Sequence, residues 1–323
     1  MSAADPFAAL SAEERALLRP APLPERVRAM TATLTEERFS DPGWIYERKL
    51  DGIRCLAIVD GRDVRLLSRN NLSLNARVPE LAAALANDPA SDLVLDGEIV
   101  AFDGAQTSFA RLQQRGERDV ATFLYAFDLL HLAGHDTTAL PLRARKALLR
   151  RAVSFRGPLR LTPHRNRDGE ALFREACRKG WEGLIAKRAD APYTHGRSRD
   201  WLKFKCSAEQ ELVIGGFTSP QGSRTELGAL LLGHYADGRL RYAGKVGTGF
   251  TRATLRDLGE RLAPLRQDRS PFADEVRERG ATWVRPRLVA QVGFTEWTRD
   301  GRLRHPRFLG LRDDKAAAEV VRE

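Results

Sequence analysis

The stretch Lys49-Leu50-Asp51-Gly52-Ile53-Arg54 decides how the first half of the chain folds. The residues before it, 44–49, alternate as in a β-strand, and Asp51-Gly52 is a strong turn dipeptide. Lys49 is therefore expected at the end of a strand, where a rigid scaffold can aim its amine. A lysine attacks only as the neutral amine, so like charges such as Arg48 and Arg54 would have to favour loss of its proton. A hairpin that ends in a solvated lysine would give the same pattern.

Five further stretches place charged residues beside or inside apolar runs of the β type. A charge in such a position is costly unless it meets a ligand or a partner. These stretches are Leu93-Val94-Leu95-Asp96-Gly97-Glu98-Ile99-Val100, Phe123-Leu124-Tyr125-Ala126-Phe127-Asp128, Glu182-Gly183-Leu184-Ile185-Ala186-Lys187, Trp201-Leu202-Lys203-Phe204-Lys205 and Arg312-Asp313-Asp314-Lys315.

In this order and with these spacings, the six motifs between Trp44 and Lys315 resemble those of ATP-dependent DNA ligases of the covalent nucleotidyltransferase superfamily. The string Phe308-Leu309-Gly310-Leu311-Arg312-Asp313-Asp314-Lys315 is most similar to the ligase module of bacterial ligase D and its stand-alone relatives. The resemblance implies an α+β protein with two domains, a mixed α/β adenylyltransferase core of largely antiparallel sheets followed by an OB-fold β-barrel. We expect an N-terminal lead-in segment at 1–40, the adenylyltransferase domain at 41–207 and the OB-fold domain at 208–323.

Composition agrees with a folded protein that binds a polyanion. The 323 residues are 42% hydrophobic and 30% charged, and 53 basic against 43 acidic residues give a net charge of +10. No run approaches the length of a membrane-spanning helix, and no signal-peptide core opens the chain. The three scattered cysteines, Cys55, Cys177 and Cys206, suggest a reducing cytosol, and Cys55 and Cys206 are interpreted as small buried fillers.

Alternation, turn dipeptides and helix-capping residues predict the order of elements. In the first domain we expect helices at 79–87, 142–153 and 169–179, the last capped by Asp168, and strands at 44–50, 53–59, 63–68, 94–102, 123–130, 183–188 and 201–206. The second domain is expected to contain a helix from Thr251 to about Leu265 and strands at 211–217, 228–236, 239–246, 287–297 and 302–305.

The resemblance implies a three-step reaction. Lys49 attacks the α-phosphorus of ATP and forms lysyl-AMP, AMP moves to the 5′-phosphate of a DNA nick, and the 3′-hydroxyl displaces it. For Asp51 we favour a role in shaping the turn and the local charge over a role as a base.

Each step adds negative charge to phosphate oxygens, so metal ions and cations should carry the catalysis. Glu98 and Glu182 match the family's metal-binding carboxylates, whose oxygens suit Mg²⁺ or Mn²⁺. Lys187, Lys203 and Lys205 match its phosphate-contacting lysines. Since 203 and 205 lie two apart on a strand, they share a face, although a solvated edge would show the same alternation.

Other motif positions correspond to the family's nucleotide-binding residues. Phe127 matches the aromatic residue that stacks on the base, with Ile185 in the aliphatic segment opposite, although Phe127 would also suit a plain core. Glu47 matches the position that helps to recognise adenine, and Arg54 the ribose-contacting arginine. Arg69, in Ser68-Arg69-Asn70, matches the arginine that meets the AMP or nick phosphate, a task that suits a planar guanidinium.

Arg312 and Lys315 match a family motif on the second domain that orients pyrophosphate in the first step and then moves away. This implies a hinge near residues 205–210. Basic stretches at 245–252 and 285–307 are expected to follow the backbone of nicked double-stranded DNA, and 193–199 is expected to be a loop that faces DNA.

Two other classes share part of this pattern. An RNA ligase or a guanylyl-transferring capping enzyme has the lysine motif, but the Glu98 context and the C-terminal string favour a DNA ligase. A non-enzymatic nucleic-acid-binding module is disfavoured, because every motif keeps its chemically active residue types. Without an upstream DNA-binding domain in this sequence, we expect a cytoplasmic, nucleoid-associated monomer that is assisted by a Ku-like end-binding protein or a repair polymerase.

Overall fold

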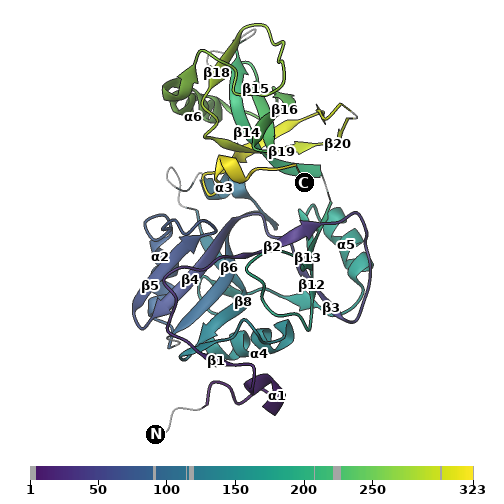
Figure 1. The fold of residues 1–323 in the computed structure, drawn as a ribbon. Coiled ribbons are helices and arrows are strands. Elements are labelled where there is room, and N and C mark those ends of the chain that lie inside the picture. The colour runs from purple at the N-terminus through teal and green to yellow at the C-terminus, as the bar shows by residue number, and fades with distance from the viewer. Residues whose placement is uncertain are drawn as a thin grey trace. The chain divides into compact units, whose positions relative to one another are not determined.

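The computed structural model describes residues 5–89, 92–113, 115, 120–206, 208–220, 227–298 and 300–322. The chain divides into two compact units, Met1–Cys206 and Ser207–Glu323, each described by itself (Figure 1). Among the described residues, no helix has both the length and the apolar character needed to cross a membrane.

Within the described part of the first unit, the larger sheet has eight strands and is here called sheet A. Its central strands are antiparallel, and the order is β1-β9-β8-β6-β4-β5, with β10 added to β8 and β7 to β6. The strands are β1 (Arg19–Pro20), β4 (Ile53–Asp60), β5 (Asp63–Ser68), β6 (Leu93–Asp103), β7 (Gln106–Thr107), β8 (Thr122–Leu132), β9 (His135–Asp136) and β10 (Leu159–Leu161).

The smaller sheet of this unit, sheet B, has five strands in the order β11-β3-β12-β13-β2. The strands are β2 (Met30–Leu34), β3 (Trp44–Arg48), β11 (His164–Arg165), β12 (Gly183–Arg188) and β13 (Gly196–Lys205). Only β2 runs parallel to its neighbour, β13.

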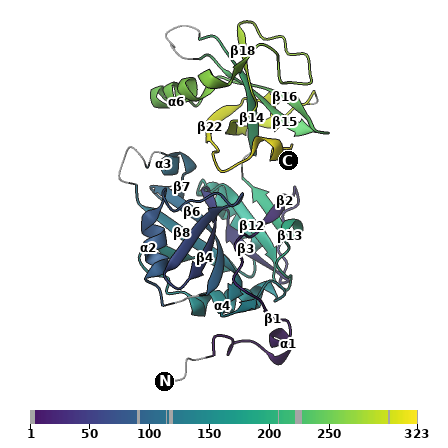
Figure 2. The same ribbon diagram turned by 60° about the vertical axis from the view of Figure 1, so that its left-hand side comes forward.

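Helices cover the outer face of each sheet, and an apolar layer joins the two inner faces. Helices α2 (Pro79–Ala86), α3 (Phe109–Gln113) and α4 (Leu142–Ala152) pack on sheet A (Figure 2). Helix α5 (Gly169–Arg178) packs on β3 and β12 of sheet B (Figure 1). The layer between the sheets contains Leu56, Ile58, Val94, Phe127 and Leu130 from sheet A and Met30 and Trp201 from sheet B.

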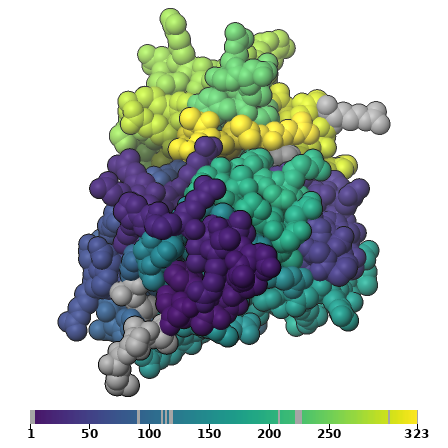
Figure 3. Space-filling model, turned by 60° about the horizontal axis from the view of Figure 1, so that its bottom comes forward, coloured from purple at the N-terminus to yellow at the C-terminus, as the bar shows by residue number. Residues whose placement is uncertain are grey.

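The N-terminal segment, expected as a lead-in at 1–40, is part of the first compact unit. Phe7 and Leu10 are buried in the core of sheet A, and the segment lies against the surface of the unit, where it is purple in Figure 3. It includes the short helix α1 (Ala12–Arg15), which begins after the capping residue Ser11. Strand β2 then completes sheet B, and its Met30 is fully buried. The composition of the segment did not indicate this strand, because its pairing partner lies more than 160 residues further along the chain.

The second unit has a small barrel-like sheet of seven strands in its described part, with two clusters of buried apolar residues. The long strand β14 pairs with three others, β15, β18 and β19, and helix α6 (Arg252–Leu262) packs its buried Leu258 and Leu262 into the core. The strands are β14 (Ala208–Thr218), β15 (Leu230–Ala236), β16 (Arg239–Val246), β17 (Arg266–Gln267), β18 (Ala281–Val284), β19 (Val289–Phe294) and β22 (Arg307–Leu311), and a separate pair consists of β20 (Glu296–Trp297) and β21 (Leu303–Arg304). Short 3-10 helices are η2 (Ala263–Leu265) and η3 (Ala317–Glu319).

Three local predictions are wrong. Asp168 precedes α5 in a left-handed conformation, with φ of 59°, and its side chain makes no capping hydrogen bond among the described residues. Residues 196–199, expected in a loop, belong to β13, where 196–198 pair with β2; only 193–195 of that stretch lie outside a strand, and Tyr193 is buried. Cys206 is not a free filler but forms a disulfide bond with Cys177 of α5, whereas Cys55 is buried and unbonded to sulfur as expected.

Candidate active site

The predicted site residues of sheet B lie on one face of three neighbouring strands. Ile185 on β12 lies opposite Glu47 on β3 and opposite Lys203 on β13. Since side chains alternate along a strand, Glu47, Ile185, Lys187, Trp201 and Lys203 share this face, here called the inner face. The outer face carries Tyr46, Leu184, Ala186, Leu202 and Phe204, which pack together with α5.

Sheet A brings a second set of predicted residues towards the inner face. Arg54 on β4 lies opposite Glu98 on β6, and Phe127 lies on β8. The guanidinium carbon of Arg54 is 4.7 Å from the ring centre of Phe127 and 5.6 Å from that of Trp201. Arginine and lysine side chains of the two sheets therefore meet over aromatic rings inside the first unit.

Lys49 lies directly after β3, as predicted, and its ammonium group pairs with Glu182. The Nζ atom donates a hydrogen bond to Oε1 of Glu182, and the two side chains are only 18% and 10% exposed. The backbone N–H of Lys49 also donates to the carbonyl of Gly183, at 2.9 Å, which fixes the strand end against β12.

The charges around Lys49 correct the expectation that Arg48 and Arg54 favour its deprotonation. Burial tends to lower the pKa of Lys49, but the carboxylate of Glu182 and the charges of Asp51 and Glu98 outweigh it and raise the pKa above its usual value. The two arginines are turned to other partners, Arg48 to the ring of Trp181 and Arg54 to Asp96. Without a ligand, Lys49 is therefore held as the ammonium ion.

The turn after Lys49 is fixed by Asp51 and Gly52. Oδ2 of Asp51 accepts a hydrogen bond from the N–H of Phe109 at 2.9 Å, and the N–H of Asp51 donates to Oγ1 of Thr107 at 3.1 Å. A Cβ atom at Gly52 would lie 2.2 Å from the carbonyl oxygen of Ile99, so only glycine fits there. These contacts favour the structural role that we preferred for Asp51.

Glu182 has a feature that suits a bound cation. Its second oxygen, Oε2, is buried and finds no hydrogen-bond partner among the described residues, which is costly unless a ligand meets it. The negative charge of Glu98 also raises the pKa of Lys49, so both predicted carboxylates lie near this lysine. The described residues contain no group of three or more His, Cys, Asp or Glu side chains arranged to hold a metal. A metal here would therefore need ligands beyond the protein, and carboxylate oxygens with phosphate and water suit Mg²⁺.

Glu47 is buried between two lysines. Its Oε2 lies 2.7 Å from Nζ of Lys187 and its Oε1 lies 2.5 Å from Nζ of Lys146, a residue of α4. Burial tends to raise the pKa of Glu47, but the two ammonium groups outweigh it, and the pKa is lowered. Burial and the charge of Lys146 together lower the pKa of Lys187 to about 8, against the attraction of Glu47. Glu47 is therefore a buried anion.

Phe127 lies in the layer between the sheets, with cations against its ring. Nζ of Lys187 is 4.1 Å from the centre of this ring and 3.9 Å from that of Trp201. Ile185 packs into the same layer, whereas Leu184 lies on the outer face, so the aliphatic side chain near Phe127 is Ile185.

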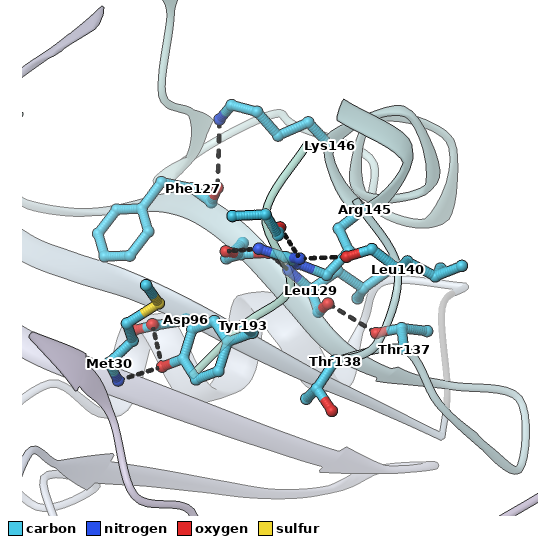
Figure 4. A network of polar contacts seen from close by, with 12 residues as sticks. Met30, Asp96, Phe127, Leu129, Thr137, Thr138, Leu140, Arg145, Lys146 and Tyr193 are labelled. Carbon is cyan, nitrogen blue, oxygen red and sulfur yellow. Dashed lines mark hydrogen bonds and ion pairs between the residues drawn. The ribbon is translucent and has the colours of Figure 1, made fainter. Parts of the chain in front are cut away.

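Arg54 is held by a buried acid and a tyrosine. It donates to both oxygens of Asp96, at 2.5 and 2.6 Å, and to the carbonyl of Met30 at 3.0 Å. The hydroxyl of Tyr193 donates to Asp96 at 2.7 Å and accepts from the N–H of Met30 at 2.7 Å, as Figure 4 shows. This network fixes the guanidinium of Arg54 beside Phe127.

The other predicted residues of the first unit lie at the borders of this region. Arg69 is half-buried in the turn after β5, and its neighbour Ser68 lies opposite Cys55, which follows Arg54. Lys203 and Lys205 are half-buried on β13, where Lys205 lies opposite Gly183. Lys205 is therefore beside the strand end that carries Lys49.

Arg312 and Lys315 lie in the second unit, where both form ion pairs. Arg312 donates to the two oxygens of Asp314 at 2.9 and 2.8 Å, and Lys315 is 3.2 Å from Glu211. Asp313 accepts from Arg261 of α6 at 2.5 Å. The charged residues of the C-terminal string are thus held by neighbours in their own unit.

Four residues of the site lie outside the set predicted from the sequence. Lys146, Asp96, Tyr193 and Trp201 contact predicted site residues directly. Asp96 and Trp201 lie within two of the motif stretches, so their position in the sequence could have indicated a role in the site. Lys146 is one cation among several in an arginine-rich helix, and nothing in the sequence separates it from the others.

Comparison with known families agrees with this arrangement. Residues 22–205 match the family model "ATP dependent DNA ligase domain", and residues 223–315 match "ATP dependent DNA ligase C terminal region". Because the first match alone spans more than half of the chain, the chain belongs to the family of ATP-dependent DNA ligases. Its fold is accordingly a nucleotidyltransferase domain followed by an OB-fold domain.

Within that family the chain is similar to ligase D proteins. It is 42% identical over 317 residues to the multifunctional non-homologous end joining protein LigD of Pseudomonas aeruginosa, covering 94% of this chain and 37% of the relative. It is 43% identical over 290 residues to the corresponding DNA repair protein of Mycobacterium tuberculosis, covering 87% of this chain and 37% of the relative. The chain thus spans 37% of the length of these two relatives.

A solved structure shares the fold over most of the chain. The structure of mycobacterial DNA ligase D complexed with ATP and MES aligns with a TM-score of 0.67 and 38% identity, and the alignment covers 92% of this chain and 98% of that one. The fold expectation, α+β with a nucleotidyltransferase core and an OB-fold, is confirmed.

Proposed function

We propose that this chain seals nicks with a 5′-phosphate and a 3′-hydroxyl in DNA by way of a lysyl-AMP intermediate on Lys49 and a DNA-adenylate. One observation carries the proposal: Lys49 stands at the end of β3, paired with Glu182, whose other oxygen is buried without a hydrogen-bond partner in the described part of the chain. This places an amine beside an incompletely satisfied carboxylate next to a region rich in cations and aromatic rings. Such an arrangement suits attack on a nucleotide phosphate.

The amine of Lys49 has to lose its proton before it attacks. Glu182 accepts a hydrogen bond from the ammonium group and stabilises it, so the ligand-free chain stores Lys49 in its unreactive form. A divalent cation at Glu182 and Glu98 would supply positive charge that favours the neutral amine and screens the phosphates. Deprotonation of Lys49 would then depend on nucleotide and cation binding together.

Binding of the nucleotide would use the inner face and its neighbours. Phe127 and Ile185 offer apolar surfaces for the base, Glu47 an acceptor for the amino group of adenine, and Arg54 a donor for the ribose. Phosphate oxygens would be met by the cationic side chains Arg69, Lys187, Lys203 and Lys205.

Arg312 and Lys315 would act only in the first step, where they would orient the pyrophosphate. Their contacts with Asp314 and Glu211 would then be exchanged for contacts with phosphate. This role requires the second unit to move between steps, which is compatible with one connection between two separately folded units.

The pathway and partners follow from the relatives. The names of the LigD relatives refer to non-homologous end joining, so we propose that this chain works in DNA repair or end joining on double-stranded DNA. We also propose that it acts as a monomer near the nucleoid, with help from a Ku-like end-binding protein or a repair polymerase. The net charge of +10 supports an electrostatic grip on DNA that weakens steeply with salt.

The direct test is self-adenylylation. With radiolabelled ATP and Mg²⁺, the chain should acquire an acid-stable label, and intact-mass analysis should find a form heavier by one AMP. Lys49→Ala should lose the label completely, whereas Lys179→Ala, which changes an exposed lysine of the same unit, should keep it. Labelling of Lys49→Ala would reject Lys49 as the nucleophile. Sealing of nicked DNA but not nicked RNA would separate a DNA ligase from an RNA ligase.

A second test separates the steps at which the C-terminal string acts. Arg312→Ala should lower self-adenylylation by about a hundredfold and change the sealing of a pre-adenylylated nick by less than about threefold, because only the first step involves pyrophosphate. Single-turnover rates of the two reactions measure this. Equal losses in both would contradict a role limited to the first step.

A further inference from the structure

Lys146 is a buried cation that belongs to none of the six motifs. It lies on α4, its side chain is 6% exposed, and its Nζ is 2.5 Å from Oε1 of Glu47. The same Nζ donates a hydrogen bond to the backbone carbonyl of Phe127 at 3.1 Å, as Figure 4 shows. One ammonium group thus joins the two residues that we propose to recognise the base, one on each sheet.

Among the described residues, Glu47 pairs with two lysines, and one of them, Lys187, has a further task in the proposed reaction. Lys187 also pairs with Glu47, at 2.7 Å, but under the proposed function it contacts phosphate. A phosphate would compete with Glu47 for this ammonium group, since both are anions. Lys146 has no such second task in the proposed reaction: the other hydrogen bond that its Nζ makes within the described part of the chain goes to the backbone carbonyl of Phe127.

The charge of Glu47 matters for its proposed role. The amino group of adenine is a hydrogen-bond donor, and an ionised carboxylate accepts from it more strongly than a protonated carboxyl group does. A carboxylate that is 2% exposed loses ionisation unless a cation stays beside it. When Lys187 turns to phosphate, Lys146 is the cation of the described residues that still pairs with this carboxylate.

We propose that Lys146 is a positioning residue for adenine specificity: it keeps Glu47 ionised and aligned with Phe127 while Lys187 engages the phosphates. This inference rests on the proposed function, and it adds a specificity role for a helix residue outside the recognised motifs. It makes the preference for ATP depend on α4 as well as on the strands of the inner face.

Self-adenylylation kinetics with two nucleotides test this role. The probes are ATP and purine riboside 5′-triphosphate, which lacks the amino group at the 6-position. In Lys146→Met, the KM for ATP should rise about ten- to hundredfold, the range of one charge-assisted hydrogen bond, while the KM for the analogue should change by less than about threefold. Lys146→Arg should restore most of the preference for ATP. Arg151→Met, which changes an exposed cation near the end of the same helix, should behave as the unchanged protein.

Each outcome decides the proposal. Equal rises in KM for both nucleotides, or a fall in kcat alone, would show a general structural role and overturn it. Absence of labelling in the unchanged chain would instead overturn the proposed function.

A double-mutant cycle covers the case in which Lys146→Met fails to fold. Because Lys146 acts through Glu47, adding Lys146→Met to Glu47→Gln should change the ratio of the two KM values by less than about twofold. The double variant removes both charges and leaves no carboxylate buried without its partner. A further large loss of preference for ATP in the double variant would contradict action through Glu47.

Discussion

The inner and outer faces of β3, β12 and β13 are made by alternating residues of the same three strands, yet their chemistry is opposite. On the outer face, Tyr46, Leu184 and Phe204 pack against α5 with almost no exposed surface. On the inner face, Glu47 and Lys187 are equally buried but charged. The comparison teaches that one strand can supply core and site together, provided that every buried charge is matched by a partner.

The two faces also differ in what holds them. The outer face depends on apolar packing, which changes little with pH or ligands. The inner face depends on ion pairs whose members can exchange an internal partner for a phosphate or a cation. Substitutions on the outer face should therefore mainly lower stability, and substitutions on the inner face should mainly lower activity.

Neighbouring substitutions on β13 give the largest expected contrast. Phe204→Ala removes a fully buried ring from the outer face and should lower the free energy of unfolding by about 3–5 kcal/mol. Lys203→Ala, on the inner face, should lower that free energy by less than about 1 kcal/mol but slow self-adenylylation by about a hundredfold. Denaturant unfolding and labelling rates measure the two effects. If both variants lost stability alike, the division of labour between the faces would be refuted.

The disulfide bond is the next test, because it ties α5 to the outer face. Cys177 lies on α5 and Cys206 directly follows β13, 29 residues further along the chain. Closing a loop of this length should stabilise the oxidised protein by about 3–4 kcal/mol, because it lowers the conformational entropy of the unfolded chain. Non-reducing peptide mapping should find the linked peptides, and Cys206→Ser should unfold at lower denaturant concentration.

Reductant provides the control for this comparison. It should lower the stability of the unchanged protein to that of Cys206→Ser and leave the variant unaffected. Self-adenylylation should hardly change, because the bond lies on the face away from Glu47 and Lys187. If reductant did not change the stability of the unchanged protein, the disulfide bond would be absent in solution.

The outer face and most strands follow from the sequence for a physical reason. Alternation in 44–48 and turn dipeptides such as Asp60-Gly61 are local signals, and the observed β3, β4 and β5 match them within one or two residues. The strands that the sequence analysis missed, such as β2 and β18, are short, and distant partners stabilise them. Their local sequence carries too little information to indicate them.

The partners within the site could not be predicted in the same way. The motifs identified Lys49, Glu47 and Lys187 as chemically important. They did not indicate that Glu182 would pair with Lys49, or that Lys146 would pair with Glu47. Ion pairs between distant residues depend on how the sheets and helices meet, and one sequence does not reveal that. The wrong expectation for Arg48 and Arg54 has the same cause, since proximity in sequence was taken for proximity of charge.

The smallest expected effect concerns the proton on Lys49. Cyanate reacts only with the neutral amine, and the raised pKa of Lys49 keeps that form rare at pH 8. Its carbamylation rate should therefore increase with pH throughout the range from 7 to 9. Glu182→Gln removes the negative partner, so the pKa of Lys49 should fall and carbamylation at pH 8, followed by peptide mass analysis, should become severalfold faster. Glu175→Gln, which alters an acid paired with Lys179 on the outer side, should leave the rate unchanged. If Glu182→Gln also left it unchanged, Glu182 would not control the protonation of Lys49, and the charges of Asp51 and Glu98 would have to hold it as the ammonium ion instead.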